Sequence, residues 1–181
     1  LYCEKNIGRT RVEMPQFKGK PVPGSEASKM PLNKDGEVDT EPVFRKMLKD
    51  KGIKTTQTEV PADRLKATQS ELGADKVLGM VDSLEKDPTN ENLTGPVFVS
   101  RDGYVIDGHH RWAAIAAYNA KHPDKQIPMK CEVIDKPIKQ AIPMCNKFAS
   151  DIGIASKAQG VTTGNKAVAE NKIIKLSDFL K

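Results

Sequence analysis

The sequence predicts a mixed α/β (α+β) fold: a small mixed sheet with packed helices, and an extended arm at each end. Two observations favour this class. β-prone and amphipathic helical segments alternate through the middle of the chain, and both ends lack a sustained apolar period. A length of 181 residues is typical of one domain. We therefore expect an N-terminal arm with one short helix over 1–55, a compact domain over 56–136, and a C-terminal helix and tail over 137–181.

The N-terminal region is rich in Lys, Pro, Gly and Ser over residues 1–38 and offers little apolar surface to offset its chain entropy. We expect it to lie as an arm on the domain or on a neighbouring molecule. A short amphipathic helix follows. Thr40 or Asp39 is suited to cap it, Pro42 falls in its first turn, and Gly52 suits its C-terminal end.

The remaining elements follow from periodicity and turn residues. The predicted elements are a strand over 56–61, a helix over 75–86, a polar loop over 87–95, a hairpin over 96–106, a helix over 110–120, a strand over 127–134 and a helix over 137–150. The hairpin is indicated by Asp102-Gly103, since glycine accepts the positive φ that a tight turn requires. Residues 166–181 are expected to form a last helix or a short tail.

Charge and cysteine content set broad limits on function. The net charge of +5 favours anionic partners weakly, because no run of Lys and Arg forms a block. Cys3, Cys131 and Cys145 lack metal-ligand spacing and are odd in number, which predicts reduced thiols in an intracellular protein. The longest apolar run, Trp112 to Tyr118, is too short to span a bilayer. No signal peptide opens the sequence.

Chemistry is concentrated in the loop Asp107-Gly108-His109-His110-Arg111, between a predicted strand and an alanine-rich helix. A helix N-terminus presents unpaired N–H groups and a partial positive charge, so it is suited to bind an anion. Gly108 lets the backbone approach a ligand closely, and Arg111 can hold two phosphate oxygens at once. Asp107 can orient a histidine or hold a divalent metal beside the phosphate.

Other interpretations of this loop stay open. Paired histidines beside an aspartate also occur in hydrogen-bonded turns that bind no ligand. A zinc site is disfavoured, because adjacent residues rarely converge on one ion and no cysteine or distant histidine joins them. We expect Trp112 to anchor the core. Two of the three histidines lie next to each other at a glycine turn that opens a helix, and this favours a functional site.

The run Gly103 to Ala114 resembles the signature loop of the ParB/sulfiredoxin superfamily, in which a glycine, polar or basic residues and an alanine-rich helix follow a strand. Val60 to Gln69 is similar to the opening strand of that family and the polar segment before its first helix. Pro96 to Val99 looks like its P-V-x-V strand, and Ile127 to Val133 looks like the strand after the signature helix. The resemblance implies a ParB/sulfiredoxin-like domain over 56–136.

Members of the superfamily differ in chemistry, and this chain departs from several of them. Sulfiredoxins carry a catalytic cysteine where His109 stands, so the resemblance does not extend to their reaction. Chromosome-partitioning ParB proteins carry Glu-Arg-Arg in place of His109-His110-Arg111 and need a helix-turn-helix module, which is not recognisable after Asp135.

Two other groups match better. Free-serine kinases share the Asp-Gly-His-His-Arg type of loop but use an upstream catalytic glutamate. Here Thr68, Gln69 and Ser70 occupy that region and Glu71 is displaced from it by about two residues. Glutamine cannot act as a general base. ParB-like nuclease or NTPase domains of plasmids and phages often carry Thr-Gln at this point, as Thr68-Gln69 does, so this group is the most similar.

The resemblance thus implies a phosphate- or nucleotide-binding domain with nuclease or NTPase activity, from a phage or mobile element and located in the host cytoplasm or a virion. It implies catalytic roles for Asp107, His109, His110 and Glu71, phosphate or nucleotide binding by Gly108, His109, His110, Arg111, Thr68 and Gln69, and metal binding by Asp107. The expected ligands are ATP, ADP or CTP with Mg²⁺. The alternatives are a non-catalytic interaction module of a virion or nucleoprotein assembly, which contacts a protein partner through the terminal arms, and a serine-type small-molecule kinase.

DNA is a further expected ligand. If Arg64, Lys66, Arg101 and Arg111 share a face, each phosphate contact should add close to one unit to the slope of log affinity against log salt. We expect weak, non-specific binding. No membrane association is expected.

Overall fold

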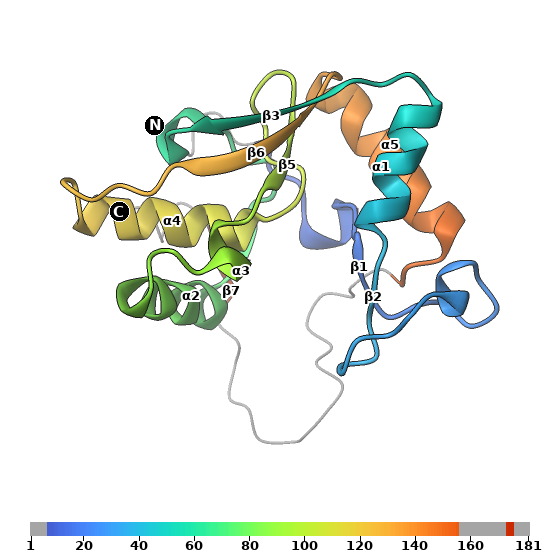
Figure 1. The fold of residues 1–181 in the computed structure, drawn as a ribbon, viewed down its shortest axis with the longest axis horizontal. Coiled ribbons are helices and arrows are strands. Elements are labelled where there is room, and N and C mark those ends of the chain that lie inside the picture. Colours follow the sequence, from blue (N-terminus) through green and yellow to red (C-terminus); the bar gives the residue numbers. More distant parts are fainter. Residues whose placement is uncertain (1–6, 156–172, 176–181) are drawn as a thin grey trace.

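The computed structural model describes residues 7–155 and 173–175, and it confirms the mixed α/β fold (Figure 1). The central sheet has the strand order β3-β6-β5, with β3 at Thr55–Val60, β5 at Val97–Ser100 and β6 at Met129–Ile134. β3 runs antiparallel to β6, and β5 runs parallel to it. Two further two-stranded sheets pair β1 (Lys18–Gly19) with β2 (Val38–Asp39), and β4 (Glu71–Gly73) with β7 (Ile173–Lys175).

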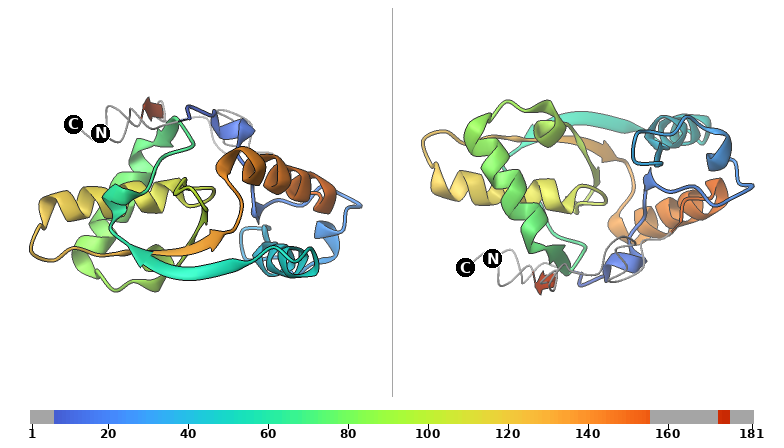
Figure 2. Two further views of the ribbon diagram at one scale, coloured as in Figure 1. Left: turned by 90° about the horizontal axis from the view of Figure 1, so that it is seen from above. Right: turned by 90° about the horizontal axis from the view of Figure 1, so that it is seen from below.

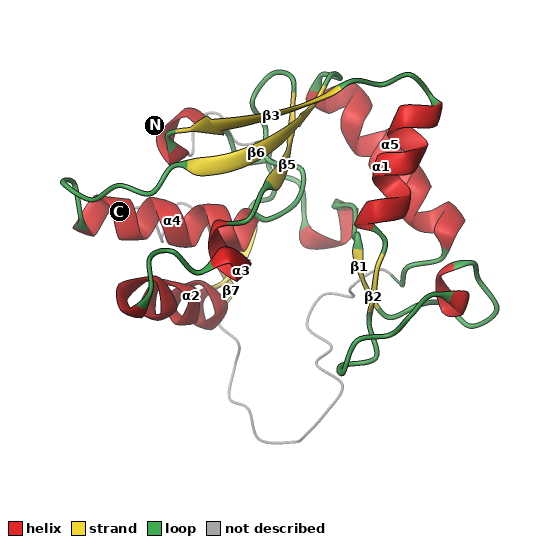
Figure 3. Cartoon of the chain, in the orientation of Figure 1, coloured by secondary structure: helices red, strands yellow, loops and turns green. Residues whose placement is uncertain are grey.

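The helices lie in two groups. α2 (Ala74–Lys86) and α4 (His109–Lys121) lie together below the sheet in Figure 1, whereas α1 (Glu41–Asp50) and α5 (Ile138–Ile152) lie side by side at its right-hand end. Figure 3 shows the same two groups in red, with α3 (Glu91–Thr94) beside the first. Alternate residues of β5 pack against different helix groups. Val97 and Val99 belong to the core formed with α2 and α4, and Phe98 belongs to the core formed with α1 and α5.

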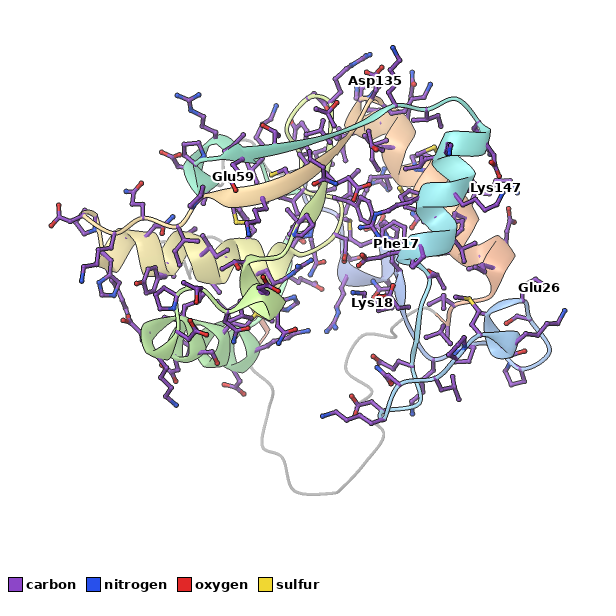
Figure 4. All side chains as sticks on the ribbon, viewed as in Figure 1. Phe17, Lys18, Glu26, Glu59, Asp135 and Lys147 are labelled. Atoms are coloured by element: carbon purple, nitrogen blue, oxygen red, sulfur yellow. The ribbon has the colours of Figure 1, made fainter. Side chains whose placement is uncertain are left out.

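The expected N-terminal arm lies on the domain and contributes side chains to the core formed by α1 and α5. Phe17 is 1% exposed, and its ring centroid lies 4.5 Å from that of Phe44 and 5.2 Å from that of Phe98. Phe17 is labelled beside α1 in Figure 4. Met14 and Val38 are buried with it. Burial of these scattered apolar side chains offsets the entropy of ordering a segment that has little regular structure.

The predicted helices before residue 156 are confirmed to within a few residues, as are the strands over 56–61 and 127–134 and the first half of the hairpin. The second half of the hairpin forms an isolated bridge between Val105 and Val99, and the short strands β1, β2 and β4 were not predicted. Three other features also differ from the prediction. α3 lies inside the predicted loop, where the Asn90 side chain accepts a hydrogen bond from the N–H of Asn92. β3 is exposed along nearly its whole length although its sequence alternates. Residues 173–175, within the expected last helix or tail, form the strand β7. The rest of 156–181 lies outside the described residues, so the predicted C-terminal tail stays a prediction.

The cysteines of the described part of the chain, Cys131 and Cys145, are buried and form no disulfide, whereas Cys3 lies outside the described residues. None of the described helices combines the length and apolarity needed to cross a bilayer.

Candidate anion-binding site

The signature loop begins where a hairpin returns to the sheet. Gly103 has a φ of +83° in the turn, the N–H of Ile106 donates to the carbonyl of Phe98 at 2.8 Å, and α4 starts directly after Gly108. Gly108 has a φ of +93°, and a Cβ added there would come 2.5 Å from Cγ1 of Val97. Glycine is therefore required by backbone conformation and by packing on Val97. The N-cap residue of α4 is Gly108, which has no side chain to cap the first N–H groups of the helix.

A cavity of about 260 Å³ opens at this helix N-terminus, and we call it the α4 cavity. Its walls come from residues 11–18 of the N-terminal segment, from the start of α1, from α2 and α3, and from the loop 106–111. Four cationic residues and two carboxylates line it: Arg11, Lys18, Lys76, Arg111, Glu41 and Asp107. Four positive charges against two negative ones leave the lining at +2, with the histidines counted as neutral.

His109 is tied into the protein and is only 4% exposed. Its Nε2 accepts hydrogen bonds from the backbone N–H of Thr68 at 3.1 Å and of Gln69 at 3.2 Å. Burial, together with the neighbouring His110, lowers the pKa of His109 to about 3. Its ring is therefore neutral and fixes the segment 67–70 to the start of α4. Its Nε2 is occupied by these two backbone donors, so the expected catalytic role of His109 stays a prediction.

His110 also uses its Nε2 to accept a backbone hydrogen bond, from the N–H of Gly73 at 3.1 Å, and it lines the cavity. Thr68 is fully buried, does not line the cavity, and donates its hydroxyl to the carbonyl of Val105 at 2.7 Å. Gln69 does line it and donates its side-chain amide to the carbonyl of Glu71. Of Thr68 and Gln69, which were both expected to bind a nucleotide, only Gln69 lines the cavity.

Arg111 combines a structural contact with a place in the cavity wall. Its Nη1 donates to the carbonyl of Gly95 at 3.2 Å and its Nη2 to the carbonyl of Pro96 at 3.3 Å. A guanidinium has five N–H donors, so these two bonds fix its plane and leave donors for a ligand. Arg111 also lies close enough to Asp107 to oppose the rise in the pKa of that carboxyl.

Asp107 lies beside these cations at the end of the returning hairpin strand. Burial raises the pKa of its carboxyl, Glu41 adds to the rise, and Arg111 and Lys18 oppose it. The expected second carboxylate, Glu71, does not line the cavity. The second carboxylate in the cavity lining is that of Glu41.

Glu41 is held in the cavity wall by a chain of charges. One of its oxygens lies 3.0 Å from Nζ of Lys18 and the other 3.2 Å from Nη2 of Arg45. Arg45 in turn pairs at 2.9 Å with the buried Glu132 of β6. Figure 4 labels Lys18 next to Phe17, where the N-terminal segment meets α1. No sequence motif marks Glu41, Lys18 or Arg11 as site residues, so none of them was predicted.

The cations expected to share a DNA-binding face are divided between the two ends of β5. Arg111 contacts the carbonyls just before β5, whereas Arg101 follows its last residue and pairs with Asp135 at 3.2 Å. Lys66 lies over the ring of Tyr104, 4.2 Å from its centroid. Of these residues, only Arg111 lines the α4 cavity.

Comparisons with known proteins add no identification. No family model, curated protein or solved structure matches the chain. Membership of the ParB/sulfiredoxin superfamily therefore stays a prediction from the residues of the loop and its flanking segments.

Proposed function

We propose that the α4 cavity binds a phosphate group of a nucleotide or nucleic acid, and that the chain is a ParB-like nuclease or NTPase domain. One observation carries the proposal: four cationic side chains from three separate segments converge on the N-terminus of α4. A helix N-terminus and nearby guanidinium and ammonium groups favour the same ligand, an oxyanion. A volume of about 260 Å³ is small for a whole nucleotide, so the cavity would hold the phosphate end.

Asp107 is the residue best suited to the chemical step. A carboxylate whose pKa is raised accepts a proton more readily than an ordinary one, which is what a general base requires. In hydrolysis, water attacks phosphorus, Asp107 takes the proton of that water, and the bond to the leaving oxygen breaks. Arg111 and the other lining cations stabilise the negative charge that develops on the phosphate oxygens.

A magnesium ion fits the site as a companion of the phosphate. Among the described residues, no group of three or more His, Cys, Asp or Glu could hold a metal ion. Mg²⁺ in phosphoryl transfer usually takes one or two carboxylates, phosphate oxygens and waters, so Asp107 would serve as its protein ligand and, with the metal bound, not as the base. When bound, it would neutralise charge on the phosphate.

Nucleotide and DNA binding by the wild type, Arg111→Ala and Arg101→Ala tests the binding step. Arg101 is a matched control because it is exposed and does not line the cavity. We expect Arg111→Ala to lose at least tenfold in affinity, a loss of about 1.4 kcal/mol, with Arg101→Ala unchanged. Since Arg111 also holds two carbonyls, thermal melting of each variant must accompany the titration. Equal binding by all three folded proteins would refute the proposed site.

The second candidate is a serine-type small-molecule kinase. It is favoured by one observation: Glu41 lines the cavity with Asp107 and supplies the second carboxylate that Glu71 does not. The two activities differ in product, because a kinase transfers the phosphoryl group to an added alcohol and an NTPase releases it as inorganic phosphate. Binding without turnover, in the wild type as well as in Asp107→Asn, would indicate the non-catalytic interaction module.

A further inference from the structure

β3 is an edge strand of the central sheet. One of its edges carries unpaired backbone groups, and the side chains on both of its faces are exposed. It pairs with β6 over all six residues without a bulge, and Thr55 to Glu59 are all exposed. β5 is flanked by the returning hairpin strand, where Val99 bridges Val105, but no described segment pairs with the outer edge of β3. Both views in Figure 2 show β3 running along the outside of the sheet.

The register shows which backbone groups face outwards. The N–H of Asp135 donates to the carbonyl of Lys54 at 3.0 Å, and this pair continues the β3–β6 register by one residue. In an antiparallel ladder, hydrogen-bonded and non-hydrogen-bonded pairs alternate. Thr56 and Thr58 therefore bond to β6, whereas the N–H and C=O groups of Thr55, Gln57 and Glu59 point to the open edge.

We propose that β3 pairs antiparallel with β3 of a second copy of this chain, about a two-fold axis through Gln57. The outward-facing groups permit hydrogen-bonded pairs only between residues 55, 57 and 59 of the two copies. With the axis at Gln57, Thr55 pairs with Glu59 of the partner subunit, and Thr56 stands opposite Thr58 of the partner subunit. The two sheets join into one continuous six-stranded sheet.

Self-pairing is favoured by the charges at the ends of the strand. Lys51 and Lys54 precede β3, and Glu59 and Asp63 lie towards its other end, where Arg64 offsets only part of the negative charge. Figure 4 labels Glu59 at the end of β3 remote from α1. Antiparallel pairing brings the basic end of each copy to the acidic end of the other. Threonine pairs across strands add further stabilisation.

The strand also lacks the features that prevent edge pairing. It contains no proline and no bulge, and Glu59 is its only charged residue. No residue of β3 lines the α4 cavity, so this interface and the proposed phosphate site can be tested independently.

Sedimentation of the full chain from about 10 to 300 µM, with the variants Gln57→Lys and Thr58→Lys, tests the proposal. Both positions are exposed, so both variants should remain folded. Gln57→Lys sets like charges directly opposite each other on the axis, whereas Thr58→Lys faces a threonine. We expect a concentration-dependent dimer of twice 19.9 kDa for the wild type and a dimer dissociation constant raised about fivefold or more by Gln57→Lys. Thr58→Lys should raise it less, because it removes the threonine pairs but sets no like charges opposite each other.

A third variant addresses the hydrogen bonds themselves. Gln57→Pro removes an outward-facing N–H, a position at which an edge strand tolerates proline. It should be monomeric, with a circular dichroism spectrum like that of the wild type. A wild type that stays monomeric over the whole range would overturn the proposal and leave the edge to a strand of a different protein. A dimer that is equally stable in Gln57→Lys and Thr58→Lys would also overturn it.

Discussion

The imidazole of His109 and the backbone of Thr68 are joined by a buried hydrogen bond, with Nε2 accepting the N–H at 3.1 Å. Gln69 donates to the same nitrogen at 3.2 Å. One neutral ring thus satisfies two buried backbone donors and connects the loop before β4 to the start of α4. The site depends on this contact because Gln69 and the α4 N-terminus both border the cavity.

Replacing His109 by Phe should therefore destabilise the protein while nearly keeping side-chain volume. Two buried N–H groups would lose their acceptor, at a cost of about 2 kcal/mol or more. Urea unfolding monitored by circular dichroism measures the loss. His122→Phe is the control, since His122 is partly exposed and pairs with Glu85 at the surface, and we expect it to change stability by about 0.5 kcal/mol or less. Equal stability of both variants would contradict the assigned role of His109.

The same histidine predicts a pH dependence of stability. The unfolded chain protonates His109 near pH 6.5, whereas the folded protein keeps it neutral down to about pH 3. Its contribution is complete above pH 6.5 and is lost as the pH falls from there towards 3. Between pH 7 and pH 5, the free energy of unfolding should fall by about 2 kcal/mol more in the wild type than in His109→Phe. Parallel pH profiles of the two proteins would show that His109 is not buried in its neutral form.

The loop could be predicted from the sequence because its signal is local. A strand, Gly108, two histidines and an arginine at the start of a helix are neighbours in the chain. The opposite wall could not be predicted, because Arg11, Lys18 and Glu41 reach the cavity through contacts distant in sequence. Those contacts depend on the burial of Phe17 and its neighbours, and no helical or strand periodicity of apolar residues predicts that burial.

The exposure of β3 is a second feature that could not be predicted from the sequence. The alternation of its residues predicted a strand but not its exposure, and the residues on both faces are exposed because neither helix group covers this edge of the sheet. Propensity and pattern identified the strand, and only the arrangement of the helices determines which face is covered.

Neutralising Glu41 should strengthen anion binding. The Glu41→Gln variant removes one of the two carboxylates from the cavity lining and raises its charge from +2 to +3. Affinity for a nucleotide should rise about threefold at low salt and less at 0.5 M salt, because ions screen the interaction. Isothermal titration at both salt concentrations measures the change. Glu26→Gln, at an exposed residue outside the cavity lining, is the control and should bind like the wild type.

The salt dependence of DNA binding should show whether the cations of the cavity or the other basic residues contact the DNA phosphates. If DNA phosphate enters the α4 cavity, Arg11→Ala should lower the slope of log affinity against log salt by about one unit. Arg101→Ala should leave that slope unchanged, because Arg101 lies at the far end of β5 and pairs with Asp135. Titration of a fluorescent duplex at several salt concentrations gives both slopes. A larger effect from Arg101→Ala would place the DNA at the hairpin turn and away from the cavity.

Gly108→Ala should destabilise the protein even in the absence of any ligand. The new Cβ would meet Cγ1 of Val97 at 2.5 Å while the residue holds a φ of +93°, so packing and backbone strain both oppose it. Gly36→Ala separates these two causes, since Gly36 has a φ of +70° but nothing within 4 Å of an added Cβ. We expect a cost of about 1 kcal/mol at Gly36 from conformation alone, and about 3 kcal/mol at Gly108, where overpacking adds to it. In a Val97→Ala background, Gly108→Ala should cost less than in the wild type, because the methyl group that the new Cβ meets is absent. Thermal unfolding of the wild type, the three single variants and the double variant measures these costs, and equal costs at Gly36 and Gly108 would mean that the loop moves away from Val97 without penalty.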